Sequence, residues 1–110
     1  NARSSALQGM KDAILHTSPE TIPQHLALIV PSLASRFVDE DSTVRKSSMS
    51  ILFQDVSRRL IENVNKNNMG DRMRPFLPLL LAYIGSALHS LDVDIRYDGC
   101  HALESLCRFH

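Results

Sequence analysis

Three consecutive acidic residues, Asp39, Glu40 and Asp41, form a cluster whose composition could support chemistry. Grouped carboxylates bind Mg²⁺ or act together as a general acid and base. The same residue types suit a helix N-terminus, because their oxygens accept hydrogen bonds from unpaired N–H groups and their charge matches the helix dipole. No glycine-rich phosphate loop, nucleophile or histidine accompanies them in the sequence. We therefore interpret them as capping residues and predict that the chain is not an enzyme.

Histidine and cysteine are the next candidates, as ligands of a metal ion. Cys100 and Cys107 lie seven residues apart in a predicted helix, which separates them by roughly 10 Å, beyond the reach of a disulfide. They do not form a zinc-finger pattern with each other or with a histidine. We predict two reduced thiols packed in the core, an intracellular location, no metal and no cofactor. The histidines considered are His16, His25, His89, His101 and His110.

A basic stretch allows two interpretations. It carries five basic side chains within seventeen residues against two acidic ones, Glu62 and Asp71. Positive charge near the end of a helix is often only a solvated edge that suits the dipole. The alternative is a contact to RNA phosphates or to an acidic partner, although no aromatic residue is interleaved to stack on bases. The five candidate contact residues are Arg58, Arg59, Lys66, Arg72 and Arg74.

The overall composition limits the partners. The 110 residues carry 12 basic and 12 acidic side chains, so the net charge is zero and argues against wholesale capture of nucleic acid or of a lipid surface. The longest apolar run, Phe76 to Leu88, is too short to span a bilayer and contains Pro78 and Gly85. Apolar residues make up 44% of the chain and aromatic residues only 5%. We predict one all-α domain with an aliphatic core and no membrane segment.

Hydrophobic periodicity and helix punctuation predict about five helices that would position these residues. Pro31 lies inside the second of them and should bend it. The last is expected to bury Ile95, Ala102, Leu103 and Leu106 beside the two cysteines. No alternating pattern typical of strands appears. The predicted helices run from about Ser4 to His16, Ile22 to Val38, Thr43 to Asn65, Arg74 to Ser90 and Asp94 to Arg108.

The chain also contains an internal repeat. Asp41 to Arg45 aligns with Asp92 to Arg96 at an offset of 51 residues, and Leu33, Phe37 and Leu52 then align with Ile84, Leu88 and Leu103. In both copies a small residue lies four places after the apolar residue that precedes the arginine: Ser48 follows Val44, and Gly99 follows Ile95. The N-terminal residues of the chain align with the second half of this repeat, so that Arg3 aligns with Arg45.

Each unit is therefore a helix, an acidic turn, an apolar-Arg pair and a second helix. Such a hairpin must stack on a neighbour to bury its apolar face, which is typical of HEAT and armadillo repeats. We predict an α-solenoid of stacked antiparallel hairpins, with a half repeat at residues 1–17 and full repeats at 18–66 and 67–110. Arg–Asp pairs at the turns should fix the register between units. The predicted register residues are Arg45, Arg96, Asp41 and Asp92.

Three segments together resemble the N-terminal domain of the testis-expressed-ten family, whose fungal members are the Ipi-type pre-rRNA-processing subunits. They are Asp39–Lys46, Leu81–Leu88 and Asp94–Asp98, and the opening Ser5–Lys11 is similar too. The first segment alone is generic to HEAT repeats. The others make the resemblance more specific, and it extends over most of the chain.

The resemblance implies a non-catalytic scaffold subunit of a nuclear complex, in the nucleolus or nucleoplasm. That complex would act in large-subunit rRNA processing, including removal of the internal transcribed spacer from the pre-60S particle. The implied partners are a larger helical-repeat subunit, a β-propeller subunit and the pre-ribosomal particle. The alternative is an RNA-contacting helical-repeat module that uses the basic edge. We also expect the end face of the stack to be covered in the full assembly.

Overall fold

Helices account for nearly all of the residues that the computed structural model describes, which are 2–18, 20–63 and 73–108. No strand occurs within those ranges. The elements in chain order are α1 (Ala2–His16), the 3-10 helix η1 (Ile22–His25), α2 (Leu26–Ala34), the 3-10 helix η2 (Ser35–Val38), α3 (Ser42–Ser50), the π-helix η3 (Ile51–Val56), α4 (Ser57–Asn63), the 3-10 helix η5 (Arg74–Phe76), α6 (Leu77–Leu88) and α7 (Val93–Cys107).

The prediction of an all-α chain with about five helices is confirmed for the described residues. The second and third predicted helices each consist of several consecutive elements: the second changes between 3-10 and α geometry, and the third between α and π geometry. Pro31 lies inside α2, which continues to Ala34 and then tightens into η2 at Ser35. The predicted boundary between residues 66 and 67 lies outside the described ranges.

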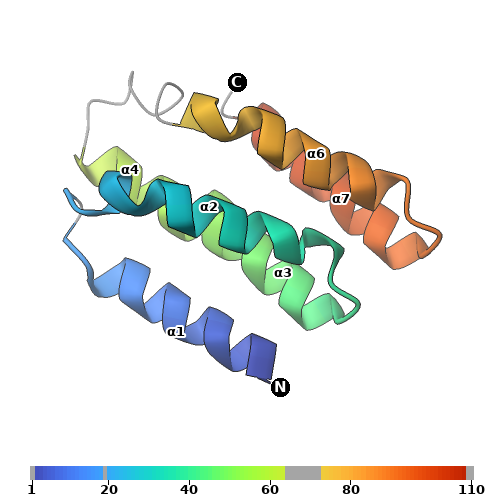
Figure 1. Cartoon of the computed structure of the whole chain (residues 1–110), viewed down its shortest axis with the longest axis horizontal. Helices are drawn as coiled ribbons and strands as arrows, with labels where there is room; N and C mark the ends of the chain where they lie inside the picture. Colours follow the sequence, from blue (N-terminus) through green and yellow to red (C-terminus); the bar gives the residue numbers. More distant parts are fainter. Residues whose placement is uncertain (1, 19, 64–72, 109–110) are drawn as a thin grey trace.

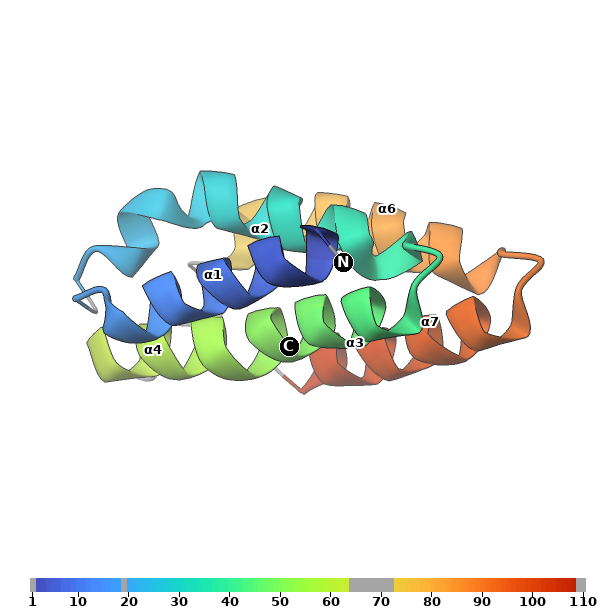
Figure 2. The same cartoon turned by 90° about the horizontal axis from the view of Figure 1, so that it is seen from below.

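The helices form two antiparallel pairs that lie side by side, and each pair contributes one helix to each of two layers. Figure 1 shows α2 and α3 as one antiparallel pair and α6 and α7 as a second, with both connecting turns at the same end of the molecule. Figure 2 shows α2 and α6 in one layer and α3, α4 and α7 in the other. Helix α1 lies on the far side of the first pair and contacts α3 and η3. This arrangement is compatible with an α-solenoid.

The core lies between the two layers and is mostly aliphatic, as the composition predicts. Phe37 is its main aromatic residue, fully buried in η2, and its ring lies 6.0 Å from the half-buried ring of Phe53. Leu7 and Ile14 attach α1 to this core. None of the described helices is long and apolar enough to cross a bilayer. The core residues that are completely inaccessible to solvent include Val30, Leu33, Val44, Leu52, Val56, Leu60 and Leu80.

One predicted part of the core is wrong. Cys100 and Cys107 are exposed, and Leu103 retains 36% of its accessible surface. Ile95, Ala102 and Leu106, predicted in the same stripe, are buried. The reason is geometric: α7 packs against α6, α3 and η2, and the two cysteines lie on a part of α7 that stays exposed to solvent.

Helices α6 and α7 approach closely at Gly99. A Cβ atom at this position would lie 2.9 Å from the Cβ of Ala87, and neither backbone can yield easily. We expect Gly99→Val to lower the free energy of unfolding by about 1–3 kcal/mol through overpacking. Gly85→Ala, in α6, is the control, since nothing lies within 4 Å of its added methyl group. That variant should gain about 0.5–1 kcal/mol from helix propensity. Urea denaturation checks both, and equal effects would contradict the close approach.

Candidate functional site: the acidic turns and Arg45

In each pair of helices, one aspartate caps the start of the second helix, and the two caps have the same geometry. Asp41 accepts a hydrogen bond from the Thr43 N–H at 2.8 Å, and Asp92 accepts one from the Asp94 N–H at 2.8 Å. Both have extended backbones, with φ and ψ of −82° and 118° at Asp41 and −83° and 122° at Asp92. These two predicted register residues therefore act as N-caps, which satisfy N–H groups that the first turn of a helix leaves unpaired.

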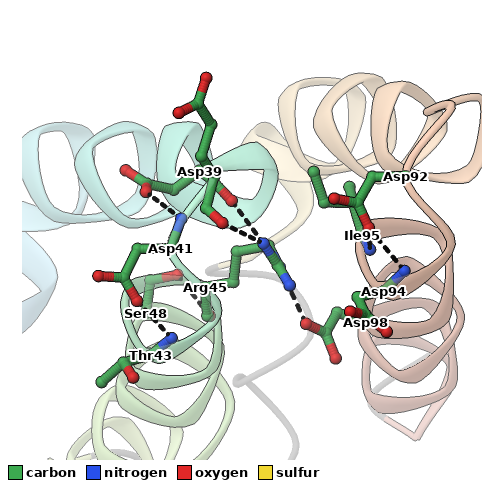
Figure 3. Close-up of polar contacts among 10 residues, drawn as sticks. Asp39, Asp41, Thr43, Arg45, Ser48, Asp92, Asp94, Ile95 and Asp98 are labelled. Carbon is green, nitrogen blue, oxygen red and sulfur yellow. Dashed lines mark hydrogen bonds and ion pairs between the residues drawn. The ribbon is translucent and has the colours of Figure 1, made fainter.

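Arg45 is the most unusual side chain of the site, because it is charged and only 2% exposed. Its Nε atom donates to Oδ2 of Asp98 at 2.9 Å, and Asp98 is itself buried in α7. Its Nη1 atom donates to the carbonyl oxygens of Asp39 and Glu40, at 2.7 and 3.1 Å. Figure 3 shows the side chain reaching from α3 toward Asp98, beneath the turn that holds Asp39. The guanidinium thus joins its own turn to the neighbouring pair of helices.

This geometry corrects the predicted pairing. Arg45 was expected to meet a turn carboxylate, but its ionic partner is Asp98, in the middle of the neighbouring helix. The turn contributes carbonyl oxygens instead, since the carboxylate of Asp41 is already occupied as a cap. Asp98 was missed because the residue 51 positions earlier is Ser47, so the internal repeat gives no signal for it.

Arg96 repeats only part of the arrangement. Its Nη1 atom donates to the carbonyl of Ser90 at 2.7 Å, which is the contact that Arg45 makes with Asp39, displaced by 51 residues. Arg96 remains partly exposed. Among the residues that the structure describes, no carboxylate forms a recorded ion pair with it.

Asp39 links the first turn to α1. Its Oδ2 atom lies 2.9 Å from Nε of Arg3, and its Oδ1 atom accepts the N–H of Asp41 at 2.9 Å. The Arg3 side chain is 52% exposed, so this ion pair is weaker than the buried one. The carboxylates of Asp39 and Asp41 are therefore both engaged in contacts within the protein. Within the described ranges, no group of three or more histidine, cysteine or acidic side chains is placed to hold a metal ion.

The candidate basic edge is only partly described. Arg58 is exposed in α4, and Arg74 is exposed at the start of η5. Arg59 is less available than predicted, because its Nη2 atom donates to the carbonyl of Thr17 and so fastens α4 to the turn after α1. Lys66 and Arg72 lie outside the described residues.

Glu20, near this edge, has a pKa below its ordinary value. The main cause is the hydrogen bond from the Ser18 hydroxyl, and the charge of Arg59 adds a smaller contribution. The carboxylate therefore remains ionised near neutral pH and offsets part of the positive charge of the basic edge.

A groove that sequence reasoning missed lies between α3–η3 and α7. Its volume is about 300 Å³, and Met49, Phe53, Tyr97 and His101 contribute to its walls. Tyr97 is 64% exposed, and its ring meets that of His101 edge-on, with the centroids 4.6 Å apart. Lys46 lies at the rim, and it also borders a second hollow of about 250 Å³ between α1 and α3. The π-helix η3 lines the groove, and π-helical turns are frequent at functional sites.

Comparison with known proteins relates the chain to a much longer protein. The chain is similar to the Testis-expressed protein 10 homolog of Danio rerio, with 26% identity over 106 residues. The match covers 96% of this chain but only 10% of that protein, so the chain spans about a tenth of the length of the relative. No protein-family model and no solved structure matches the chain. The similarity supports a relationship to the testis-expressed protein 10 family and nothing finer.

Proposed function

We propose that the chain is a HEAT-like stack with a half repeat at residues 1–17 and full repeats at 18–66 and 67–110. Two observations support this division. The caps at Asp41 and Asp92 have matching geometry, and the bonds from Arg45 and Arg96 to turn carbonyls coincide at the offset of 51 residues. Stacked units of this kind form extended rigid surfaces suited to binding other macromolecules.

The function that we propose for this stack is that of a non-catalytic scaffold in a nuclear pre-ribosome complex. It would act in large-subunit rRNA processing, including removal of the internal transcribed spacer. The observation that carries the proposal is the similarity to the Testis-expressed protein 10 homolog along almost the whole chain. The buried ion pair of Arg45 and Asp98 is consistent with a support role, since it joins two pairs of helices and leaves neither charge available for chemistry.

Partners would bind on the face formed by α1, α3 and α7. The groove there combines partly buried apolar side chains with the exposed ring of Tyr97 and the charge of Lys46. Exposed aromatic residues beside an apolar pocket are typical anchors of protein interfaces. The expected partners are a larger helical-repeat subunit and a β-propeller subunit of the same complex, bound to the pre-60S particle.

Affinity purification tests this function. The tagged chain is incubated with nuclear extract, and captured pre-60S proteins are quantified by mass spectrometry. We expect Lys46→Glu combined with Tyr97→Ala to lower capture about tenfold, which corresponds to the loss of roughly 1.4 kcal/mol at one interface anchor. Leu28→Ala, which changes an exposed side chain on α2, is the matched control and should bind normally. Failure of the unmodified chain to enrich such proteins would refute the proposed function.

A second candidate function, contact with RNA through the basic edge, is favoured by the exposure of Arg58 and Arg74. The scaffold proposal predicts that Arg58→Glu leaves the Kd for a structured pre-rRNA fragment unchanged. Fluorescence anisotropy at several salt concentrations measures this. Arg108→Glu, at an exposed position after α7, is the matched control. A tenfold weaker Kd for Arg58→Glu alone, with a salt slope reduced by about one, would favour RNA contact.

A further inference from the structure

The half-completed arrangement at Arg96 points to a missing neighbour. Arg45 and Arg96 occupy equivalent positions, one turn into α3 and α7, and each donates from Nη1 to a turn carbonyl at 2.7 Å. Nη1 of Arg45 also donates to the carbonyl of Glu40, at 3.1 Å. Nε of Arg45 reaches the next pair of helices, where Asp98 accepts its hydrogen bond.

The two arginines differ in what surrounds them. Arg45 is 2% exposed and pairs with Asp98 of α7, whereas Arg96 is partly exposed and forms no ion pair with a carboxylate of the described residues. Arg96 thus makes the same Nη1 contact with its turn, while its side chain stays partly open to a further acceptor. A carboxylate is the group that this planar donor recognises best.

The apolar residues of α6 and α7 differ from those of the first pair in the same way. Leu81 is 48% exposed and Leu103 is 36% exposed, whereas the residues 51 positions earlier, Val30 and Leu52, are completely buried. Cys100, Leu103 and Cys107 line a shallow hollow on this side. The second pair therefore presents an apolar surface of the kind that the first pair buries.

We propose that this surface docks a further helical hairpin, stacked on α6 and α7 as these helices are stacked on α2 and α3. Its second helix would place an Asp or Glu side chain against Nε of Arg96, in the way that Asp98 meets Arg45. The inference rests on the repeat architecture of the proposed function. It adds the chemistry of the occupant: an amphipathic hairpin with an apolar face for Leu81 and Leu103 and one carboxylate for Arg96.

A second copy of this chain does not fit that description. The repeat alignment places Ser5 of α1 and Ser47 of α3 at the position of Asp98, and neither has a carboxylate. The occupant is therefore a hairpin of different sequence with an acidic residue at this point.

An extended chain tests the proposal without an identified partner. Residues 57–110 are appended directly after Cys107, which keeps the 51-residue register and places a second copy of Asp98 opposite Arg96. In this extended chain, we expect Arg96→Met to lower the folding equilibrium constant at least a hundredfold, as loss of one member of a buried ion pair does. In the 110-residue chain, the same substitution should change it less than about fivefold. Changing the second copy of Asp98 to Asn should make the effect of Arg96→Met in the extended chain nearly as small as in the 110-residue chain.

Two results would overturn the proposal. One is an equal effect of Arg96→Met in both chains, which would show that the added hairpin does not cover Arg96. The other is a homodimer of the 110-residue chain in sedimentation that Arg96→Glu dissociates, which would make a second copy the occupant. Neither result depends on capture of pre-60S proteins. If Arg96→Met has the larger effect in the extended chain but the affinity purification enriches no pre-60S proteins, the proposed function alone is refuted.

Discussion

Replacing Arg45 by methionine is expected to lower the free energy of unfolding by about 3–5 kcal/mol, the usual cost of breaking a buried ion pair. Methionine keeps most of the apolar length of the side chain but leaves Asp98 buried without its cation. The carbonyl oxygens of Asp39 and Glu40 also lose their donor. Urea denaturation followed by circular dichroism measures the change. A loss of this size is a large fraction of the total stability of a small domain.

Arg96→Met is the matched control, because Arg96 has the same local bond to a turn carbonyl but no recorded ion pair among the described residues. We expect this variant to lose less than about 1 kcal/mol, as for a partly exposed charge. If both variants lost the same amount, the effect would come from the turn rather than from the contact between helix pairs.

Phe37→Ala should cost about 3–5 kcal/mol, as truncation of a fully buried phenylalanine does. Phe37 has no accessible surface, and η2, which carries it, contacts α3, α6 and α7. Its ring also packs near that of Phe53. Removing the ring therefore leaves a cavity where the two helix pairs meet. Thermal and urea denaturation should both report the loss.

Leu88→Ala is the control for this substitution, since Leu88 occupies the equivalent position in the second pair but is only partly buried. A loss of about 1–2 kcal/mol is expected there, because less surface is returned to water. Equal losses at the two positions would contradict the central place given to Phe37.

The helices and their caps could be predicted from the sequence because local signals determine them. Asp41 and Asp92 begin helices where an acidic residue precedes an apolar-Arg pair, and this pattern needs no tertiary information. The repeat at an offset of 51 residues placed Arg45 and Arg96 in equivalent turns, and the hydrogen bonds of both side chains agree with that placement.

Features that depend on contacts between distant residues were not predictable. Asp98 lies 53 residues from Arg45, and no pattern in the sequence distinguishes it from other aspartates. The exposure of Cys100 and Cys107 depends on which side of α7 is covered, whereas periodicity shows only that one side is apolar. The groove beside η3 arises from the spacing between α3 and α7, which helix propensities do not specify.

The positions of these features suggest how the scaffold would work. The buried ion pair of Arg45 and Asp98 joins the two pairs of helices beside the groove between α3 and α7. In the proposed scaffold, a groove held in this way would keep its shape when a partner binds. A preformed groove loses little conformational entropy on binding, which favours affinity.

A double-mutant cycle on Arg45 and Asp98 tests the stacking of the two helix pairs most directly. The free energy of unfolding is measured for the unmodified chain, Arg45→Met, Asp98→Leu and the double variant. The buried contact at 2.9 Å predicts a coupling energy of about 1.5 kcal/mol or more, with the double variant more stable than the sum of the single losses implies. Losses that add to within about 0.5 kcal/mol would show that the residues do not interact and would contradict the stacked arrangement.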